Sequence, residues 1–232
     1  MHDGHRGRLK ERFLREGLDN FEQHNILELL LFYVIPRKDT NEIAHRLIEK
    51  FGSISRVVEA STEELTEING IGENAAIFLK LIPEFARRYV EDKASFDNIL
   101  NSTAKAGQYL LPKFIGRTDE NIMAVMLDSK CRVLSCSIVN EGSVNSANLN
   151  IRKLVELCLK SKAVSVVLSH NHPNGLAIPS DSDIETTWKV KRALEYVGIK
   201  LLDHVIVAES DFVSMRDSKK FNMIFEDVFE ED

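Results

Sequence analysis

The apolar positions over the first ninety residues repeat with the period of an α-helix. Segment 25–36 is almost wholly apolar and stops at Pro36, whose ring nitrogen has no hydrogen to donate. In segment 40–52 the apolar side chains fall on one helical face, and Gly52 occupies the usual place of a C-terminal cap. We therefore expect a small all-helical domain over residues 1–92.

The turn Asn69-Gly70-Ile71-Gly72 lies between a short predicted helix and a long one. Two glycines on either side of an apolar residue resemble the hairpin of helix-hairpin-helix motifs. In those motifs backbone N–H groups contact a phosphate without reading bases. The structural alternative is a tight turn whose glycines adopt positive φ angles and whose Ile71 fills the core. The sequence leaves both interpretations open.

The period of the apolar positions changes after residues 93–102, which we expect to connect two domains. Two short apolar segments joined by Ser129-Lys130 predict a β-hairpin. Strand and helix periods then alternate, which is typical of a mixed sheet with helices packed on it. The predicted strands are 121–128, 131–140, 163–169 and 200–209, and the predicted helices are 150–162 and 182–198. We expect this α/β domain over residues 103–225, followed by an acidic tail over residues 226–232.

The composition points to a globular, reduced protein. The chain has 232 residues, 44% of them apolar, which is enough for one or two domains with real cores. It contains no apolar run near the roughly 20 residues of a membrane helix, and its charged first segment does not resemble a secretory signal. Cys131, Cys136 and Cys158 cannot all pair, so we expect them to be small core residues of a cytoplasmic protein.

The overall charge disfavours a nucleic-acid partner. The formal net charge is −6 at pH 7, whereas proteins that bind DNA phosphates usually present a basic surface. A basic segment near the N-terminus is the local exception, and it contains Arg6, Arg8, Lys10, Arg12 and Arg15. A phosphate contact is expected only there and at the turn over residues 69–73.

Two histidines follow the predicted strand 163–169 directly, and a serine and an aspartate come soon after them. In extended backbone the side chains of His170 and His172 leave the same face, so both can bind one ion. Asp183 can supply a third ligand, which leaves the open position of a catalytic zinc site. Each residue also has an ordinary interpretation, because Ser180-x-x-Asp183 resembles a capping box and single histidines at strand ends usually pack. The joint spacing favours the metal site.

The segment HNHPNGLAIPSDSD resembles the motif of JAMM metalloproteins, whose JAB (MPN+) domain is a mixed α/β fold similar to cytidine deaminases. With LLDHVIV, the N-terminal GHRGRLKERF and the turn INGIG, nearly the whole chain resembles the RadC family of bacteria. The resemblance implies that His170, His172 and Asp183 hold a zinc ion (Zn²⁺), with a water molecule in the fourth position. It also implies that Ser180 hydrogen-bonds the developing oxyanion.

The general base has to come from outside this motif. JAMM proteins place a glutamate at the beginning of an early strand, and Glu120 occupies that position here. Glu141 is the second candidate, although its surroundings are typical of a loop, and either residue could be an ordinary solvated glutamate. Asp203 and His204 either support the ligands or satisfy each other in a buried strand. The chain departs from the RadC pattern at Lys153, where relatives commonly carry a glutamate.

We expect a zinc-dependent hydrolase that acts on a peptide, isopeptide or related amide bond. Zinc lowers the pKa of its bound water to about 7, and a glutamate would carry the proton to the leaving group. The alternative is a DNA-associated protein of repair or recombination, whose helical domain contacts phosphates and whose metal serves a nuclease reaction or only structure. Motif spacing specifies neither the substrate nor the oligomeric state.

Overall fold

The chain divides into two compact units, residues 1–86 and 87–232. The computed structural model describes residues 3–36, 38–93, 99–141, 149–173 and 175–226. Residues 94–98 of the expected connection and residues 227–232 of the expected acidic tail therefore lie outside the described part.

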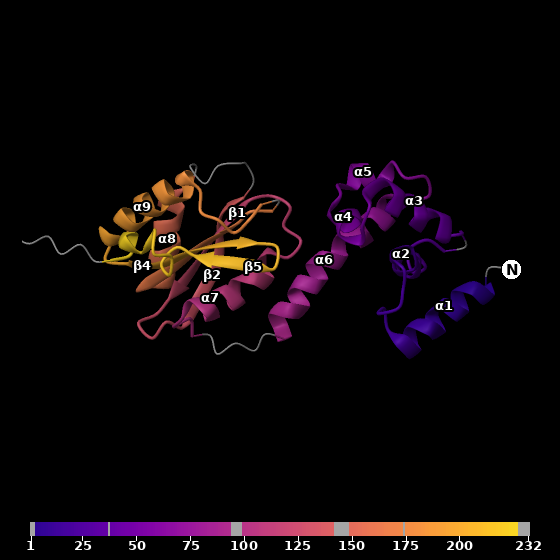
Figure 1. The fold of residues 1–232 in the computed structure, drawn as a ribbon, viewed down its shortest axis with the longest axis horizontal. Helices are drawn as coiled ribbons and strands as arrows, with labels where there is room; N and C mark the ends of the chain where they lie inside the picture. The colour runs from indigo at the N-terminus through magenta and orange to yellow at the C-terminus, as the bar shows by residue number, and fades with distance from the viewer. Residues whose placement is uncertain (1–2, 37, 94–98, 142–148, 174, 227–232) are drawn as a thin grey trace, which may run out of the picture. The chain divides into compact units, whose positions relative to one another are not determined.

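All regular elements described in the first unit are helices, as the apolar pattern predicts (Figure 1). They are α1 (Asp3–Glu16), α2 (Gln23–Leu31), α3 (Asn41–Phe51), α4 (Ile54–Glu59), α5 (Thr62–Thr66) and α6 (Glu73–Lys93), which continues into the second unit. The apolar faces of α2 to α6 meet in one core, which includes the fully buried Leu27, Leu31, Leu47, Leu65 and Leu79. Leu9 of α1 belongs to a second, smaller cluster with Phe21, Leu29 and Phe32.

The helix α2 ends at Leu31 rather than continuing to Pro36 as predicted. The backbone N–H groups of Val34 and Ile35 instead turn back onto the carbonyl oxygen of Leu31, at 3.2 and 2.8 Å. A residue that precedes proline is disfavoured in the α conformation, so the chain leaves the helix before it reaches the proline. At the end of α3, Gly52 adopts the predicted left-handed cap with φ of 84°.

The turn between α5 and α6 has the packing expected of a tight turn whose Ile71 fills the core. Ile71 is buried in the core of the first unit. Gly70 has φ of 104°, and a Cβ atom there would lie 2.6 Å from Cδ1 of Ile43. Gly72 has no positive φ, and only open space surrounds the place where its Cβ atom would be. The fold thus explains the first glycine of this turn and not the second.

The second unit is built on a five-stranded mixed sheet with the strand order β2-β1-β3-β4-β5. The strands are β1 (Asn121–Leu127), β2 (Val133–Glu141), β3 (Ser165–Asn171), β4 (Lys200–Ala208) and β5 (Asp211–Ser214). β3 and β4 are parallel, and the other three neighbouring pairs are antiparallel. This confirms the expected mixed α/β class.

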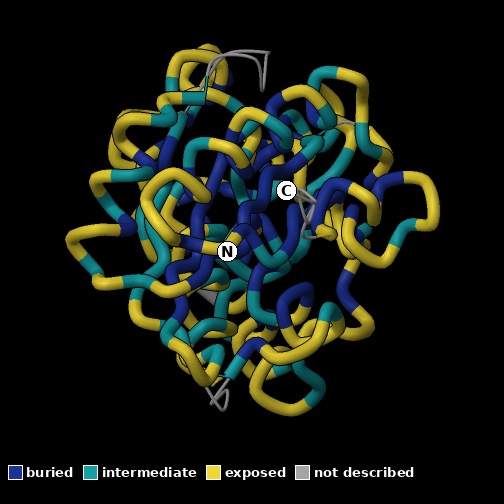
Figure 2. The backbone as a smooth tube through the Cα atoms, turned by 90° about the vertical axis from the view of Figure 1, so that its left-hand side faces the viewer, coloured by how far each residue is buried: buried dark blue, intermediate teal, exposed yellow. Residues whose placement is uncertain are grey.

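Helices cover both faces of this sheet (Figure 1). Leu154 of α8 (Ile151–Ser161) and Leu194 of α9 (Asp181–Glu195) belong to the core on one face. Leu110 of α7 (Thr103–Leu110) belongs to the core on the other face. Two short 3₁₀ helices, η1 (Leu111–Phe114) and η3 (Asn222–Ile224), complete the described elements. β1 and β3 are buried along their whole length, within the dark blue interior of Figure 2.

The sequence pattern predicts most of these elements but not all of their details. The hairpin at Ser129-Lys130 forms, closed by a 3.0 Å bond from the N–H of Cys131 to the carbonyl oxygen of Asp128. Cys131 lies in this turn with φ of 58° and not in the core as expected, whereas Cys158 is fully buried. Neither α7 nor the four-residue β5 is predicted by the sequence pattern. No helix in the described part of the chain is both long enough and apolar enough to cross a membrane.

Candidate metal centre

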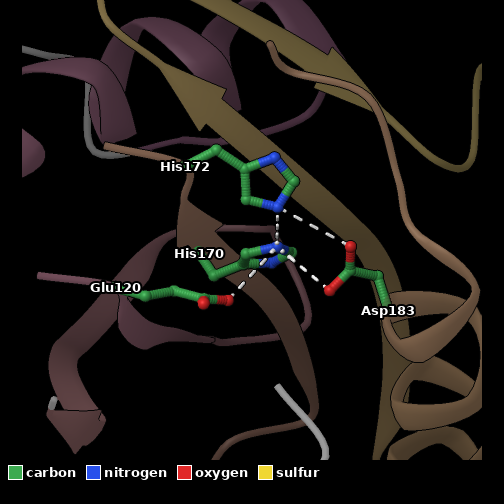
Figure 3. A group of neighbouring side chains, drawn as sticks. All are labelled: Glu120, His170, His172 and Asp183. Carbon is green, nitrogen blue, oxygen red and sulfur yellow. Dashed lines mark hydrogen bonds and ion pairs between the residues drawn. The ribbon is translucent and has the colours of Figure 1, made fainter. Parts of the chain in front are cut away.

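Four side chains of the second unit converge at the C-terminal end of β3 (Figure 3). They are Glu120, His170, His172 and Asp183, and one ligand atom from each lies within 4.8 Å of the others. The Nε2 atoms of the two histidines are 2.9 Å apart. Asp183 places Oδ1 at 3.1 Å from Nε2 of His170 and Oδ2 at 3.7 Å from Nε2 of His172. Oε1 of Glu120 is more distant, at 3.9 Å from the same atom of His170.

Two of these distances fit a tetrahedral metal ion. Zinc bonds of about 2.0–2.1 Å to nitrogen and oxygen imply ligand atoms roughly 3.3 Å apart at tetrahedral angles. The two Nε2 atoms are 2.9 Å apart and Oδ1 of Asp183 is 3.1 Å from Nε2 of His170, both close to this value, whereas the 3.7 Å distance to His172 belongs to the other carboxylate oxygen, Oδ2. Two imidazoles and a carboxylate are also a common ligand set for a divalent metal. The residues present can therefore hold such an ion.

The register of the central strands explains how Glu120 reaches the histidines. β1 and β3 are antiparallel, and Ile122 pairs with His170. Continuing that register by two residues places Glu120 opposite His172. Side chains two residues apart share a face of the strand, so the glutamate before β1 and the histidines at the end of β3 meet on one side of the sheet. A contact between positions fifty residues apart thus follows from one strand pairing.

Asn171, between the two histidines, points to the opposite face and holds the segment that carries Glu120. Its Oδ1 accepts a 2.8 Å hydrogen bond from the backbone N–H of Asn121. Its Nδ2 donates to the carbonyl oxygen of Asp119 at 3.1 Å. The residue is buried, and its amide contacts the backbone on both sides of Glu120. It is a positioning residue that the sequence analysis did not assign.

Ser180 and Asp183 form the capping box of α9 and also reach the metal centre. Oδ2 of Asp183 accepts hydrogen bonds from the backbone N–H and the hydroxyl of Ser180, at 2.8 and 2.6 Å. The hydroxyl oxygen of Ser180 accepts in turn from the N–H of Asp183 at 3.2 Å. The capping interpretation is therefore correct, and it leaves Oδ1 of Asp183 directed at His170.

Both histidines are oriented through their second ring nitrogen. Nδ1 of His172 lies 2.8 Å from the carbonyl oxygen of Leu176. Nδ1 of His170 lies 2.8 Å from Nε2 of His204 on β4, and Nδ1 of His204 lies 2.7 Å from the hydroxyl of Thr187 on α9. Thr187 was not among the residues predicted from the sequence. Its spacing of four residues from Asp183 on one helix was the available signal, because such residues share a helical face.

Comparison with known proteins assigns the chain to a family. Residues 100–220 match the family model described as the RadC-like JAB domain. The chain belongs to the RadC-like JAB family. Residues 4–77 match the UPF0758 N-terminal model. UPF0758 proteins of Fusobacterium nucleatum and Carboxydothermus hydrogenoformans are each 34% identical to the chain. These alignments cover 91% and 92% of the chain, and 94% and 95% of the two relatives.

These matches confirm the resemblance to RadC proteins that the sequence motifs indicate. The RadC-like domain contains all four of the clustered side chains. A JAB-family domain with this group of histidines and carboxylates is consistent with a metal-dependent hydrolase.

Burial and contacts with neighbouring groups shift the pKa values of three side chains in or beside the candidate metal centre. The hydrogen bond to Asp183 raises the pKa of His172. Burial raises the pKa of Asp183, but its contacts with His170 and His172 outweigh burial and lower that pKa far below its usual range. Burial and the neighbouring His170 lower the pKa of His204 well below its usual value. The centre therefore contains one firmly ionised carboxylate among the imidazoles.

The remaining predicted residues of the RadC-like domain lie in other surroundings. Glu141 ends β2 opposite Asn121 instead of standing in a loop, and its side chain lies outside the described part. Asp203 accepts a 2.6 Å bond from the hydroxyl of Ser214 and does not join the metal centre. Lys153 is exposed in the first turn of α8. Of the pair Asp203-His204, only His204 contacts a predicted ligand.

Proposed function

We propose that this protein is a zinc-dependent hydrolase that cleaves a peptide, isopeptide or related amide bond. The convergence of Glu120 with two histidines and an aspartate carries the proposal, because a glutamate beside three ligands is the arrangement of a metal-assisted hydrolase. Membership of the RadC-like JAB family supports the same reaction class. The JAB sites with known chemistry suggest the amide bond by analogy.

Each side chain has a definite task in the proposed reaction. His170, His172 and Asp183 would hold the zinc ion, which supplies a bound water whose pKa is near 7. Glu120 is half-buried, and its carboxylate lies 3.9 Å from Nε2 of His170 without belonging to the three closest ligand atoms. It would accept the proton of the attacking water and donate it to the leaving nitrogen.

Ser180 is the proposed donor to the oxyanion. Its hydroxyl donates to Oδ2 of Asp183 in this structure, so it must turn toward the substrate oxygen during the reaction. The backbone N–H of Ser180 also donates to that carboxylate oxygen and would continue to hold it. Donors of this kind stabilise the charge that develops on the substrate oxygen.

Metal content and turnover of paired variants test the proposal. In Glu120→Gln we expect about one zinc per chain to stay bound and hydrolysis of a fluorogenic peptide or isopeptide library to fall by about 10²- to 10⁴-fold, because the general base is lost. Asp183→Asn keeps an oxygen that can accept from Ser180 but removes the anionic ligand, so it should lose zinc and activity together.

Glu141→Gln is the matched control, and it should retain both zinc and turnover. Full activity in Glu120→Gln would contradict the assignment of the base. A folded wild-type protein that binds no zinc when zinc is added would contradict the proposed function itself.

We infer a DNA-associated role as the second candidate, supported by the open space at Gly72. Neither backbone conformation nor packing requires a glycine there, whereas close approach of a phosphate to the first N–H groups of α6 would. Part of the basic segment is already bound within the first unit. Arg6 donates to the carbonyl oxygens of Ile35 and Lys38, at 3.0 and 2.6 Å. Absence of DNA retention at low salt would contradict this role.

We also infer a cytoplasmic location. Cys131, Cys136 and Cys158 are all free in the structure, and unpaired cysteines are typical of proteins in a reducing compartment. Fractionation of cells that express the tagged protein tests this inference.

A further inference from the structure

A chain of hydrogen bonds runs from α9 through β4 to one of the proposed zinc ligands. The hydroxyl of Thr187 lies 2.5 Å from the carbonyl oxygen of Asp183 and 2.7 Å from Nδ1 of His204. Nε2 of His204 lies 2.8 Å from Nδ1 of His170. Thr187, His204 and His170 have exposed fractions of 0, 1 and 0%. None of these three side chains can therefore exchange its hydrogen-bond partners for bulk water.

The backbone carbonyl group of Asp183 determines where the protons of these hydrogen bonds lie. A carbonyl oxygen only accepts, so the single hydroxyl proton of Thr187 points at Asp183. The sulfur of Met215, at 3.5 Å, is a weaker acceptor for that proton. The hydroxyl oxygen can then only accept from His204, whose proton must be on Nδ1. Nε2 of a neutral His204 is consequently an acceptor, and His170 donates to it from Nδ1.

A neutral His204 follows from its surroundings. Within the described part of the chain its hydrogen-bond partners are a hydroxyl and another imidazole, and neither is acidic. A fully buried imidazole without a carboxylate partner stays uncharged, because burial disfavours the charged form. The positions of the protons between Thr187 and Nδ1 of His170 are therefore fixed.

We propose that Thr187 and His204 are positioning residues, which fix the proton of His170 on Nδ1 and so present its Nε2 lone pair to a metal ion. The inference rests on the metal site of the proposed function and adds two residues to it. Metal-bound histidines usually orient through a carboxylate, a carbonyl or water. Here a neutral histidine, His204, and a threonine, Thr187, orient the ligand His170 instead.

The chain also connects two ligands that come from different elements. The hydrogen bonds run from the backbone carbonyl of Asp183 on α9 through Thr187 and His204 to His170. Nε2 of His170 then lies 3.1 Å from Oδ1 of the same aspartate, and an ion bound by both atoms would join them. A shift of α9 relative to β3 would break one of these hydrogen bonds, so they hold the aspartate and the histidine at the spacing that an ion needs.

Removing the hydroxyl should reverse the pattern. In Thr187→Val the Nδ1–H group of His204 has no acceptor, and a buried unpaired donor is unfavourable. His204 can avoid this by moving its proton to Nε2, which then points at Nδ1 of His170. That nitrogen must become an acceptor, and the proton of His170 moves to Nε2, where it occupies the metal position.

Zinc affinity measured by competition with a chromogenic chelator tests the proposal. We expect the zinc dissociation constant to rise about 10- to 100-fold in Thr187→Val, the usual effect of losing a partner behind a ligand. Thr187→Ser keeps the hydroxyl and should bind within about threefold of wild type by the same reasoning. The matched control is Ser169→Ala, which removes another fully buried hydroxyl that donates to a carbonyl, at 2.7 Å, and should leave zinc affinity unchanged.

Wild-type affinity in a folded Thr187→Val would overturn the proposal, as would an equal loss of affinity in Ser169→Ala. A second measurement needs no variant. With ¹⁵N-labelled histidine, long-range ¹H–¹⁵N correlation spectra of the metal-free protein should show His204 as the Nδ1–H tautomer and a proton on Nδ1 of His170. An Nε2–H tautomer of His204 would also overturn it. This readout separates the two proposals, because the tautomers can be as stated in a protein that binds no zinc.

Discussion

At the scale of single residues, Asp183 can serve both as a helix cap and as the proposed metal ligand, which the sequence motif left as alternatives. Its Oδ2 completes the capping box with Ser180, and its Oδ1 faces Nε2 of His170. A carboxylate has two oxygens and about four lone pairs, so one oxygen can serve the helix while the other serves an ion. The cap also fixes the direction of the ligand. The capping and metal-binding interpretations of Asp183 are therefore compatible.

Asn171 carries the first prediction at this scale. Substitution by alanine leaves the buried N–H of Asn121 without an acceptor and frees the segment that contains Glu120. We expect Asn171→Ala to lower the free energy of unfolding by about 1–3 kcal/mol, measured by urea denaturation. Hydrolysis should fall as well, because the base is no longer held in place.

Asn171→Asp is the control for this prediction. It keeps the acceptor for the N–H of Asn121 and loses the donor to the carbonyl oxygen of Asp119. Its stability should also fall below that of the wild-type protein, because a buried carboxylate then faces the carbonyl oxygen of Asp119. Unchanged stability and turnover in Asn171→Ala would show that Glu120 is positioned by other contacts.

At the scale of elements, the turn between α5 and α6 separates a glycine that the fold needs from one that it does not. Alanine at Gly70 would stand in a left-handed conformation and within 2.6 Å of Ile43, which should cost at least about 1–2 kcal/mol of stability. Alanine at Gly72 meets neither problem. Only the alanine variant at Gly72 can therefore separate a loss of DNA binding from a loss of stability.

We expect Gly72→Ala to keep the wild-type thermal unfolding temperature. If the second candidate function is correct, this variant should also lose salt-sensitive retention on DNA. Retention that is the same in wild type and Gly72→Ala would assign the turn a purely structural role.

At the scale of the whole molecule, the RadC-like domain has enough apolar core to fold without an ion. Separate cores lie on the two faces of its sheet, and β1 and β3 are buried along their whole length. The candidate metal centre lies where β1 begins and β3 ends. The ion is therefore expected to contribute chemistry and a measure of stability, but not the fold.

Chelation should remove the metal and leave the far-ultraviolet circular dichroism spectrum unchanged. Free zinc at one hundred times its dissociation constant should add about 2.7 kcal/mol to the free energy of unfolding, because it binds only the folded chain. His172→Ala, which loses a proposed ligand, should show no such increase. Unfolding of the wild-type protein on chelation would instead indicate a structural metal site.

The sequence by itself determined those features of the structure that depend on residues close together along the chain. The spacing of His170 and His172, the Ser180-x-x-Asp183 box and the change from helical to strand period all predicted features that the structure contains, because each reflects local backbone geometry. The end of α2 and the short β5 were missed, because a proline's effect on preceding residues and a partner strand outweigh local propensity.

Only the tertiary structure decided which distant groups act together. The pairing of β1 with β3 brings Glu120 to the histidines, and the packing of α9 and β4 brings Thr187 and His204 behind His170. No periodicity along the chain records these contacts, since they depend on strand register and on hydrogen bonds between groups far apart in sequence. The proposed ligands are thus close together in the sequence, whereas the groups that orient and assist them are brought there by the fold.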